Sequence, residues 1–255
     1  MHSIYNLLIT IHVSVGFVSL ILFWVPIASQ KGSSLHIRSG NWYVNAMYVV
    51  AFTALILGLM LFIDPIATKF PNHQYNEEEL FSFISRQRQI SLFLLAISIL
   101  VLSNIRHGLL TLKAKSNHSL MRAPSHLALN TLLVATGITL LFTAAGSLSI
   151  LFYIFAALTI SIGVGNLRYC LKSEVPPMEW MISHLGSMIG AGIGSYTAFF
   201  VFGGSRFFAE FLSGQWMLVP WVLPGVAGGL AITLMSRKYS LKYKKVREKF
   251  LAAKS

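Results

Sequence analysis

The sequence of 255 residues has only 8 acidic residues and a single cysteine, Cys170. One cysteine excludes a disulfide within the chain and any CxxC metal or redox motif. The sequence also has no Walker loop, GxSxG elbow or HExxH motif, which excludes the commonest phosphate-binding and hydrolase signatures. Any polar chemistry must therefore come mainly from histidines and basic residues.

Long apolar runs dominate the rest of the sequence. With 55% hydrophobic residues, 11% charged residues and a mean hydropathy of +0.67, the composition is typical of a membrane protein. Runs of about 18 or more apolar residues indicate spanning helices, and helices satisfy their own backbone hydrogen bonds in lipid. The sequence predicts an all-α transmembrane bundle of seven spans: Ile4 to Ile27, Trp42 to Ile63, Ile90 to Leu112, His126 to Thr143, Leu148 to Leu171, Met178 to Phe202 and Trp216 to Met235. A count of five or six remains open if the pair around Gly146 is re-entrant.

The basic residues predict the orientation. Of the 20 lysines and arginines, one set of alternate loops holds only Lys69, Arg86, Arg88 and Arg206. Because basic loops stay in the cytoplasm, we expect a multi-pass inner-membrane protein with its N-terminus outside and its C-terminus cytoplasmic. The N-terminal run lacks a basic n-region and is long, which favours an uncleaved first helix over a signal peptide. Residues 1–236 then form the seven-helix domain, and residues 237–255 form a cytoplasmic polybasic tail.

Two segments outside the apolar runs carry further signals. The tail from Arg237 to Lys249 is expected to attract anionic lipids, at about 1 kcal/mol per basic residue near the surface. It is short and adjoins a spanning helix, so binding to nucleic acid is not expected. In the external segment, Asn76 to Glu79 resembles a capping box that opens a helix continuing into the third span.

Five of the 8 histidines lie in or beside the apolar runs. An ionisable or metal-ligating side chain in hydrocarbon is costly, so by default it marks a site. At 1.5 Å of rise per residue, His12 falls near the middle of the bilayer. His107, His126 and His184 fall near the cytoplasmic ends of three spans, and His36 falls in the first inner loop, just before the second helix. Four histidines therefore lie within about two turns of one cytoplasmic-side plane.

Polar neighbours at the same depth suggest a lined cavity. One helical turn separates Ser103 from His107, His126 from Asn130, and His184 from Met188. Other polar side chains at similar depth are Asn104, Arg106, Asn166 and Arg168.

Several of these side chains also have a purely structural interpretation. In that case His36 would lie in an interfacial loop, His126 would cap a helix, and Arg106 would extend to the inner headgroups. We expect His2, His73 and His118 to be solvated. Gly186, Gly190 and Gly194 form a GxxxGxxxG stripe that permits close helix packing. Packing within the bundle is the favoured reading, and a homo-oligomer through this stripe is the alternative.

Two motifs support a family resemblance. They are His12-x-x-x-Gly16 with the segment Lys31 to Met47, and the segment His184-Leu-Gly-Ser-Met-Ile-Gly190. The sequence resembles a family of predicted bacterial membrane proteins catalogued as a domain of unknown function. The resemblance implies a multispan fold and directs attention to His12, His36 and His184. It implies no activity.

Binding of haem or a transition metal for electron transfer is the leading hypothesis. Haem b takes axial ligands from facing helices, for which His12, His107 and His184 are candidates and Met188 a spare. Basic residues that would pair with the propionates are Arg38, Arg106 and Arg168. A zinc or copper ion would instead use His36, His107, His126 and His184.

Two alternatives stay open. A zinc-dependent membrane hydrolase usually needs a carboxylate, and only Glu174 and Glu179 are near the inner histidines. A carrier, channel or lipid-binding protein is disfavoured because the acidic residues lie only in loops or at the ends of spans, and no internal repeat is evident. An anionic-lipid site at Arg106 and Arg168 is the lipid-binding version. The substrate, electron partners and oligomeric state are not determined by these patterns.

Overall fold

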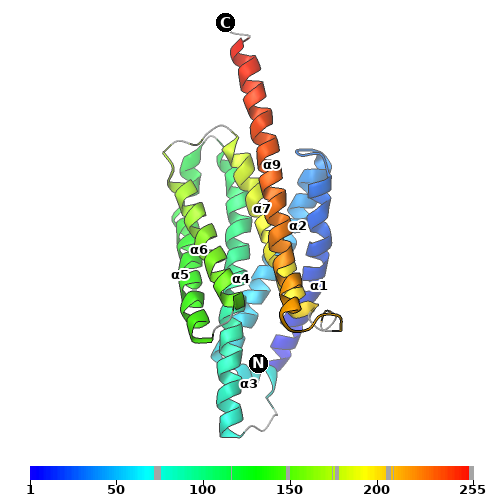
Figure 1. Ribbon diagram of the computed structural model, residues 1–255, viewed down its shortest axis with the longest axis vertical. Helices are drawn as coiled ribbons and strands as arrows, with labels where there is room; N and C mark the ends of the chain where they lie inside the picture. The colour runs from blue at the N-terminus through cyan, green and yellow to red at the C-terminus, as the bar shows by residue number, and fades with distance from the viewer. Residues whose placement is uncertain are drawn as a thin grey trace. The chain divides into compact units, whose positions relative to one another are not determined.

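The computed structural model is all-α, with no strand among the residues that it describes. Those residues are 1–71, 76–115, 117–147, 150–173, 175, 178–204, 208 and 210–252, and the side chains of 147, 215 and 245–252 are outside the description. The helices in chain order are α1 (His2–Ala28), α2 (Ser34–Ile63), α3 (Pro65–Lys69), α4 (Glu77–Ala114), α5 (Pro124–Ser147), α6 (Ile150–Leu171), α7 (Glu179–Ala198) and α9 (Leu218–Ala252) (Figure 1). Short 3₁₀ segments occupy η1 (His118–Arg122) and η3 (Gly214–Met217), and a π-helical turn, η2 (Phe199–Gly203), follows α7.

Seven of these helices are long and apolar enough to cross a membrane. Each overlaps one of the apolar runs predicted from the sequence. The seven segments are His2–Ala28, Ser34–Ile63, Glu77–Ala114, Pro124–Gly146, Ile150–Leu171, Glu179–Gly203 and Leu218–Lys244. Leu148, the predicted start of the fifth run, lies outside the described residues.

Two of the helices begin well before their apolar runs because side chains cap them. The Ser33 hydroxyl accepts the backbone N–H of His36 at 3.2 Å, and α2 starts at Ser34, not Trp42. His36 therefore lies in the first turn of a helix, and its predicted position in a loop is wrong. The predicted capping box is confirmed at the start of α4. Asn76 Oδ1 accepts the N–H of Glu79 at 2.8 Å, and Glu79 Oε2 accepts the N–H of Asn76 at 3.3 Å.

The chain divides into two compact units. The first comprises residues 1–103 and 127–168, and the second comprises residues 104–126 and 169–255, each as far as it is described. The helix α9 runs without a break through residue 236, where the sequence predicted a boundary between bundle and tail. That boundary remains a prediction.

In the first unit, α1 and α2 run side by side as a hairpin (Figure 1). Elsewhere in this unit, Ile99, Leu100 and Leu133 form a buried hydrophobic cluster. A buried polar network joins three helices there. Asn130 Oδ1 accepts the Ser103 hydroxyl at 2.7 Å and the Asn166 amide at 2.8 Å. These hydrogen bonds explain how three polar side chains are tolerated among apolar ones.

In the second unit, the end of α4 packs closely against α7. A Cβ placed on Gly108 would lie 2.5 Å from Met188 Cε and 3.1 Å from Ser187 Cβ. A Cβ placed on Gly190 would lie 3.1 Å from the Asn104 amide nitrogen, so one glycine of the predicted stripe faces α4 within the same unit. The helices α7 and α9 also lie side by side in this unit (Figure 1).

Candidate metal centre

Two of the predicted site residues meet directly. His107, on α4, and His126, in the first turn of α5, are 1% and 0% exposed. Nδ1 of His107 and Nε2 of His126 are 3.1 Å apart, so one ring donates an N–H to the other. The predicted histidine cluster is thus present, and the side chain of His126 faces His107.

Cys170 completes the group. It lies near the end of α6 and is fully buried. A metal ion could be held by a group of at least three histidine, cysteine, aspartate or glutamate side chains. Among the described residues there is one such group, formed by His107, His126 and Cys170. Their ligand atoms all lie within 4.8 Å of one another. Imidazole nitrogen and thiolate sulfur are ligands that zinc and copper accept.

Sequence reasoning missed Cys170 as a ligand. A lone cysteine excludes the motifs that contain pairs, and no spacing links it to a histidine. The one available signal was depth. Cys170 follows Asn166 and Arg168, which the sequence had placed at the level of the inner histidines.

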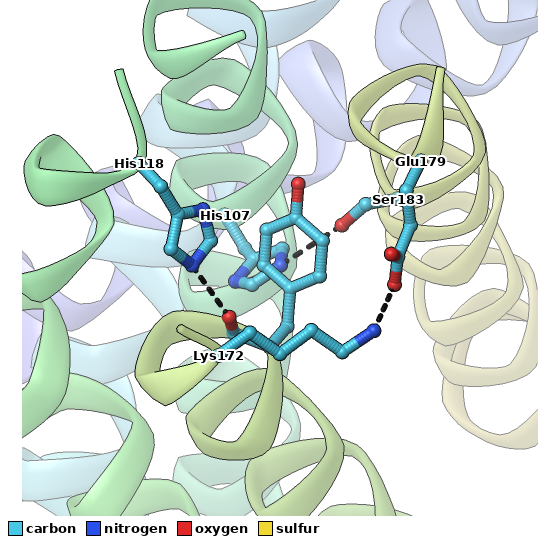
Figure 2. A network of polar contacts seen from close by, with 6 residues as sticks. His107, His118, Lys172, Glu179 and Ser183 are labelled. Carbon is cyan, nitrogen blue, oxygen red and sulfur yellow. Dashed lines mark hydrogen bonds and ion pairs between the residues drawn. The ribbon is translucent and has the colours of Figure 1, made fainter. Parts of the chain in front are cut away.

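Ser183 orients the first histidine from the opposite side. On α7, its hydroxyl lies 3.0 Å from Nε2 of His107 (Figure 2). When Nε2 carries the proton and donates a hydrogen bond to Ser183, Nδ1 of His107 is unprotonated. Its lone pair is then available to a metal ion. Metal-ligating histidines typically have such a partner on the other ring nitrogen, because it fixes the tautomer.

An aromatic wall stands beside His107. The ring of Tyr169 packs edge-on against His107 with centroids 5.3 Å apart, and against His118 at 5.2 Å. Nε2–H of His118 donates to the carbonyl of Tyr169 at 2.7 Å (Figure 2). His118 is therefore half-buried and hydrogen-bonded, and the expectation that it is solvated is wrong. Its Nδ1 is buried with no hydrogen-bond partner.

Backbone contacts hold the end of α6 in place. Arg122 donates from Nε to the carbonyl of Cys170 at 3.3 Å and from Nη2 to the carbonyl of Lys172 at 2.9 Å. The Lys172 ammonium pairs with the Glu179 carboxylate, at the start of α7 (Figure 2). Glu179 is thereby occupied by a cation and lies outside the group of ligands. Glu174, the other carboxylate considered from the sequence, lies outside the described residues.

The other predicted residues of the second unit lie near the group without joining it. His184 donates from Nδ1 to the carbonyl of Gly108 at 2.9 Å, which ties α7 to α4. Met188 packs against the same glycine. The half-buried Arg106 donates from Nη2 to the hydroxyl of Ser125 at 2.7 Å, while its Nε is buried without a hydrogen-bond partner.

The remaining candidates belong to the first unit. His12 Nδ1 lies 3.1 Å from the carbonyl of Val50, and His36 Nδ1 lies 2.9 Å from the carbonyl of Pro26. Each ring donates its N–H there, which joins α1 to α2. Arg168 is exposed, as is Arg38.

Two further histidines, His2 and His73, were expected from the sequence to be solvated. His2 is half-buried, and its Nδ1 lies 2.9 Å from the carbonyl of Thr68, so it is not simply solvated as expected. His73 lies outside the described residues.

Fold and site together describe an all-α protein, rich in long apolar helices, with a buried group of two histidines and one cysteine. Comparison with known proteins finds no matching family model, no matching curated protein and no matching solved structure. The resemblance to a family of bacterial membrane proteins therefore stays a prediction.

Proposed function

We propose that this chain is a seven-span inner-membrane protein that holds a transition-metal ion on His107, His126 and Cys170, and that the bound ion serves in electron transfer. One observation carries the metal site: three buried ligand atoms from three different helices lie within 4.8 Å of one another. Ionisable side chains are costly in an apolar bundle and are kept there for a function.

The membrane assignment is supported by seven helices of sufficient length and apolarity. The distribution of basic residues favours an N-terminus outside and a cytoplasmic C-terminus. With that orientation the metal site lies toward the cytoplasmic ends of the helices that carry it, and anionic lipids would meet the basic end of α9.

The distance between the two ring nitrogens favours a single ion over haem between these histidines. Two nitrogens that each bind one ion at about 2.0 Å are roughly 3.3–3.5 Å apart at tetrahedral or trigonal angles, and about 4 Å apart in the trans arrangement of haem ligands. The observed 3.1 Å is close to the first arrangement. Haem is therefore the less favoured cofactor for this pair.

The chemistry of the group suits electron transfer better than hydrolysis. Two histidines and a cysteine, in dry surroundings, are the ligand set of copper electron-transfer sites. Hydrolysis by zinc usually needs a carboxylate base, and no described aspartate or glutamate joins the group. The carrier and lipid-binding alternatives have no comparable contact in their favour.

The test is metal analysis of the full-length protein in detergent, purified without chelators from cells supplied with iron, copper and zinc. We expect a transition metal at a near-stoichiometric level in the wild type and in His12→Ala, a histidine of the first unit. His107→Ala and His126→Ala should lose the metal while still eluting as folded, monodisperse protein. A metal-free wild type contradicts the proposal. A reduced-minus-oxidised spectrum with sharp α and β bands that survive His107→Ala would assign haem to another place.

A further inference from the structure

The ligand set and the charges around it point to copper(I) as the ion of this site, an inference that rests on the proposed metal centre. Soft thiolate ligands select copper(I), whereas carboxylate and water favour harder ions. The group contains the thiol of Cys170 and two imidazoles, and no carboxylate among the residues that the structure describes. Softness alone also admits zinc, which accepts thiolate and imidazole ligands.

Charge separates the two ions. When an ion binds, a metal–sulfur bond forms, and the thiol of Cys170 releases its proton to solvent because thiolate is the ligand. The N–H proton that lies between His107 and His126 is not lost when the ion binds. The imidazole that carries this proton holds it on its other ring nitrogen instead; for His107 that is Nε2, beside Ser183. Copper(I) thus replaces one thiol proton, and the site stays neutral. Zinc(II) leaves a net charge of +1.

A net positive charge is costly in this place. The three ligand residues are at most 1% exposed, and a buried charge without a partner is strongly unfavourable. Neighbouring cations add repulsion, and one of them is Arg122, which donates to the backbone carbonyl of Cys170. Arg106 directly precedes His107, and its guanidinium is held by Ser125, the neighbour of His126. The carboxylate of Glu179, which could have compensated, is paired with Lys172.

Coordination number supports the same ion. Structural zinc sites almost always have four protein ligands, and catalytic zinc fills the fourth position with water. Here three protein ligands are found within the described part of the chain. Zinc would need a fourth ligand, and that ligand would have to be an anion such as hydroxide to make the site neutral. Copper(I) is neutral with the three protein ligands alone.

The experiment is a competition on the full-length, reduced protein in detergent, under anaerobic conditions. The apoprotein is equilibrated with chelator-buffered copper(I), with zinc(II), or with both, and bound metal is measured after gel filtration. We expect copper(I) to bind at a near-stoichiometric level and to exclude zinc when both are present at equal free concentration. Binding of zinc in preference to copper(I) would overturn the inference and leave the proposed metal site standing. Binding of neither ion would overturn both.

Charge variants test the stated cause. In Arg106→Gln, the affinity for zinc should rise by about tenfold or more, while that for copper(I) changes little, because a neutral complex is not repelled. The matched control is Arg86→Gln, an exposed arginine near the start of α4, which should change neither affinity. Equal changes in both affinities in Arg106→Gln would show that charge does not set the preference. Cys170→Ser should lose copper(I) while the protein remains folded by circular dichroism.

Discussion

At the scale of single residues, the candidate metal centre depends on how one ring is oriented. His107 could present either nitrogen to its surroundings, and its neighbours decide which one. Ser183 faces Nε2, and His126 faces Nδ1. A side chain without ligand chemistry of its own is therefore part of the site.

Removal of that hydroxyl should weaken metal binding without unfolding the protein. In Ser183→Ala, we expect the affinity for the ion to fall by about tenfold to a hundredfold, the usual effect of losing an outer partner of a ligand. Ser183→Thr keeps a hydroxyl and should restore most of the affinity. Ser195→Ala, on the same helix, serves as the control. Equal affinities in Ser183→Ala and the wild type would mean that the hydrogen bond does not orient His107.

A glycine sets the approach of two helices beside the site. A Cβ on Gly108 would meet Met188 Cε at 2.5 Å and Ser187 Cβ at 3.1 Å. We expect Gly108→Ala to lower the free energy of unfolding by about 1–3 kcal/mol through overpacking, measured by thermal unfolding in detergent.

Two further variants define the cause of that loss. Gly165→Ala, in α6, has no heavy atom within 4 Å of the added Cβ and should be neutral or slightly stabilising. Adding Met188→Ala to Gly108→Ala should recover part of the loss, because the two positions are in contact. If Gly108→Ala unfolds at the wild-type temperature, α4 and α7 are not tightly packed at this point.

At the scale of secondary-structure elements, the length of α4 is set by its cap. The apolar run begins only at Ile90, and the capping box, which was also predicted from the sequence, starts the helix at Glu77. The same logic places His36 within α2. Hydropathy locates the apolar part of a helix, but capping side chains decide where it begins.

The cap of α4 should matter locally. Loss of the Asn76 side chain in Asn76→Ala should cost about 1 kcal/mol, and should appear as faster amide hydrogen exchange in the first turn of α4. Glu78→Ala keeps the capping box and should exchange more nearly at the wild-type rate. Unchanged exchange in Asn76→Ala would indicate that α4 does not depend on this cap.

At the scale of the whole molecule, seven apolar helices and the basic loops predict the topology. A C-terminal green fluorescent protein fusion should fluoresce, and a C-terminal alkaline phosphatase fusion should be inactive, because we expect this end to be cytoplasmic. An N-terminal fusion pair should give the opposite result. An active phosphatase at the C-terminus would require either an even number of spans or the reverse orientation.

Sequence reasoning reached part of the candidate site. It selected His107 and His126 because histidines are rare and costly in apolar runs. It also grouped His36 and His184 with them by depth, but depth does not say which way a ring points. In the structure, His184 donates to Gly108 and His36 donates to Pro26. Each joins two helices through a backbone carbonyl.

The sequence by itself determined the helical class, the positions of the seven apolar helices and the scarcity of acidic groups. These three properties follow from hydropathy and composition, which can be read from consecutive residues without knowledge of the packing. Only the tertiary structure decided that Cys170 meets His107 and His126, and that Ser183 lies behind them. These side chains come from four helices, and their meeting depends on the rotation of each helix about its axis. That rotation is set by contacts such as Gly108 against Met188, which no local pattern encodes.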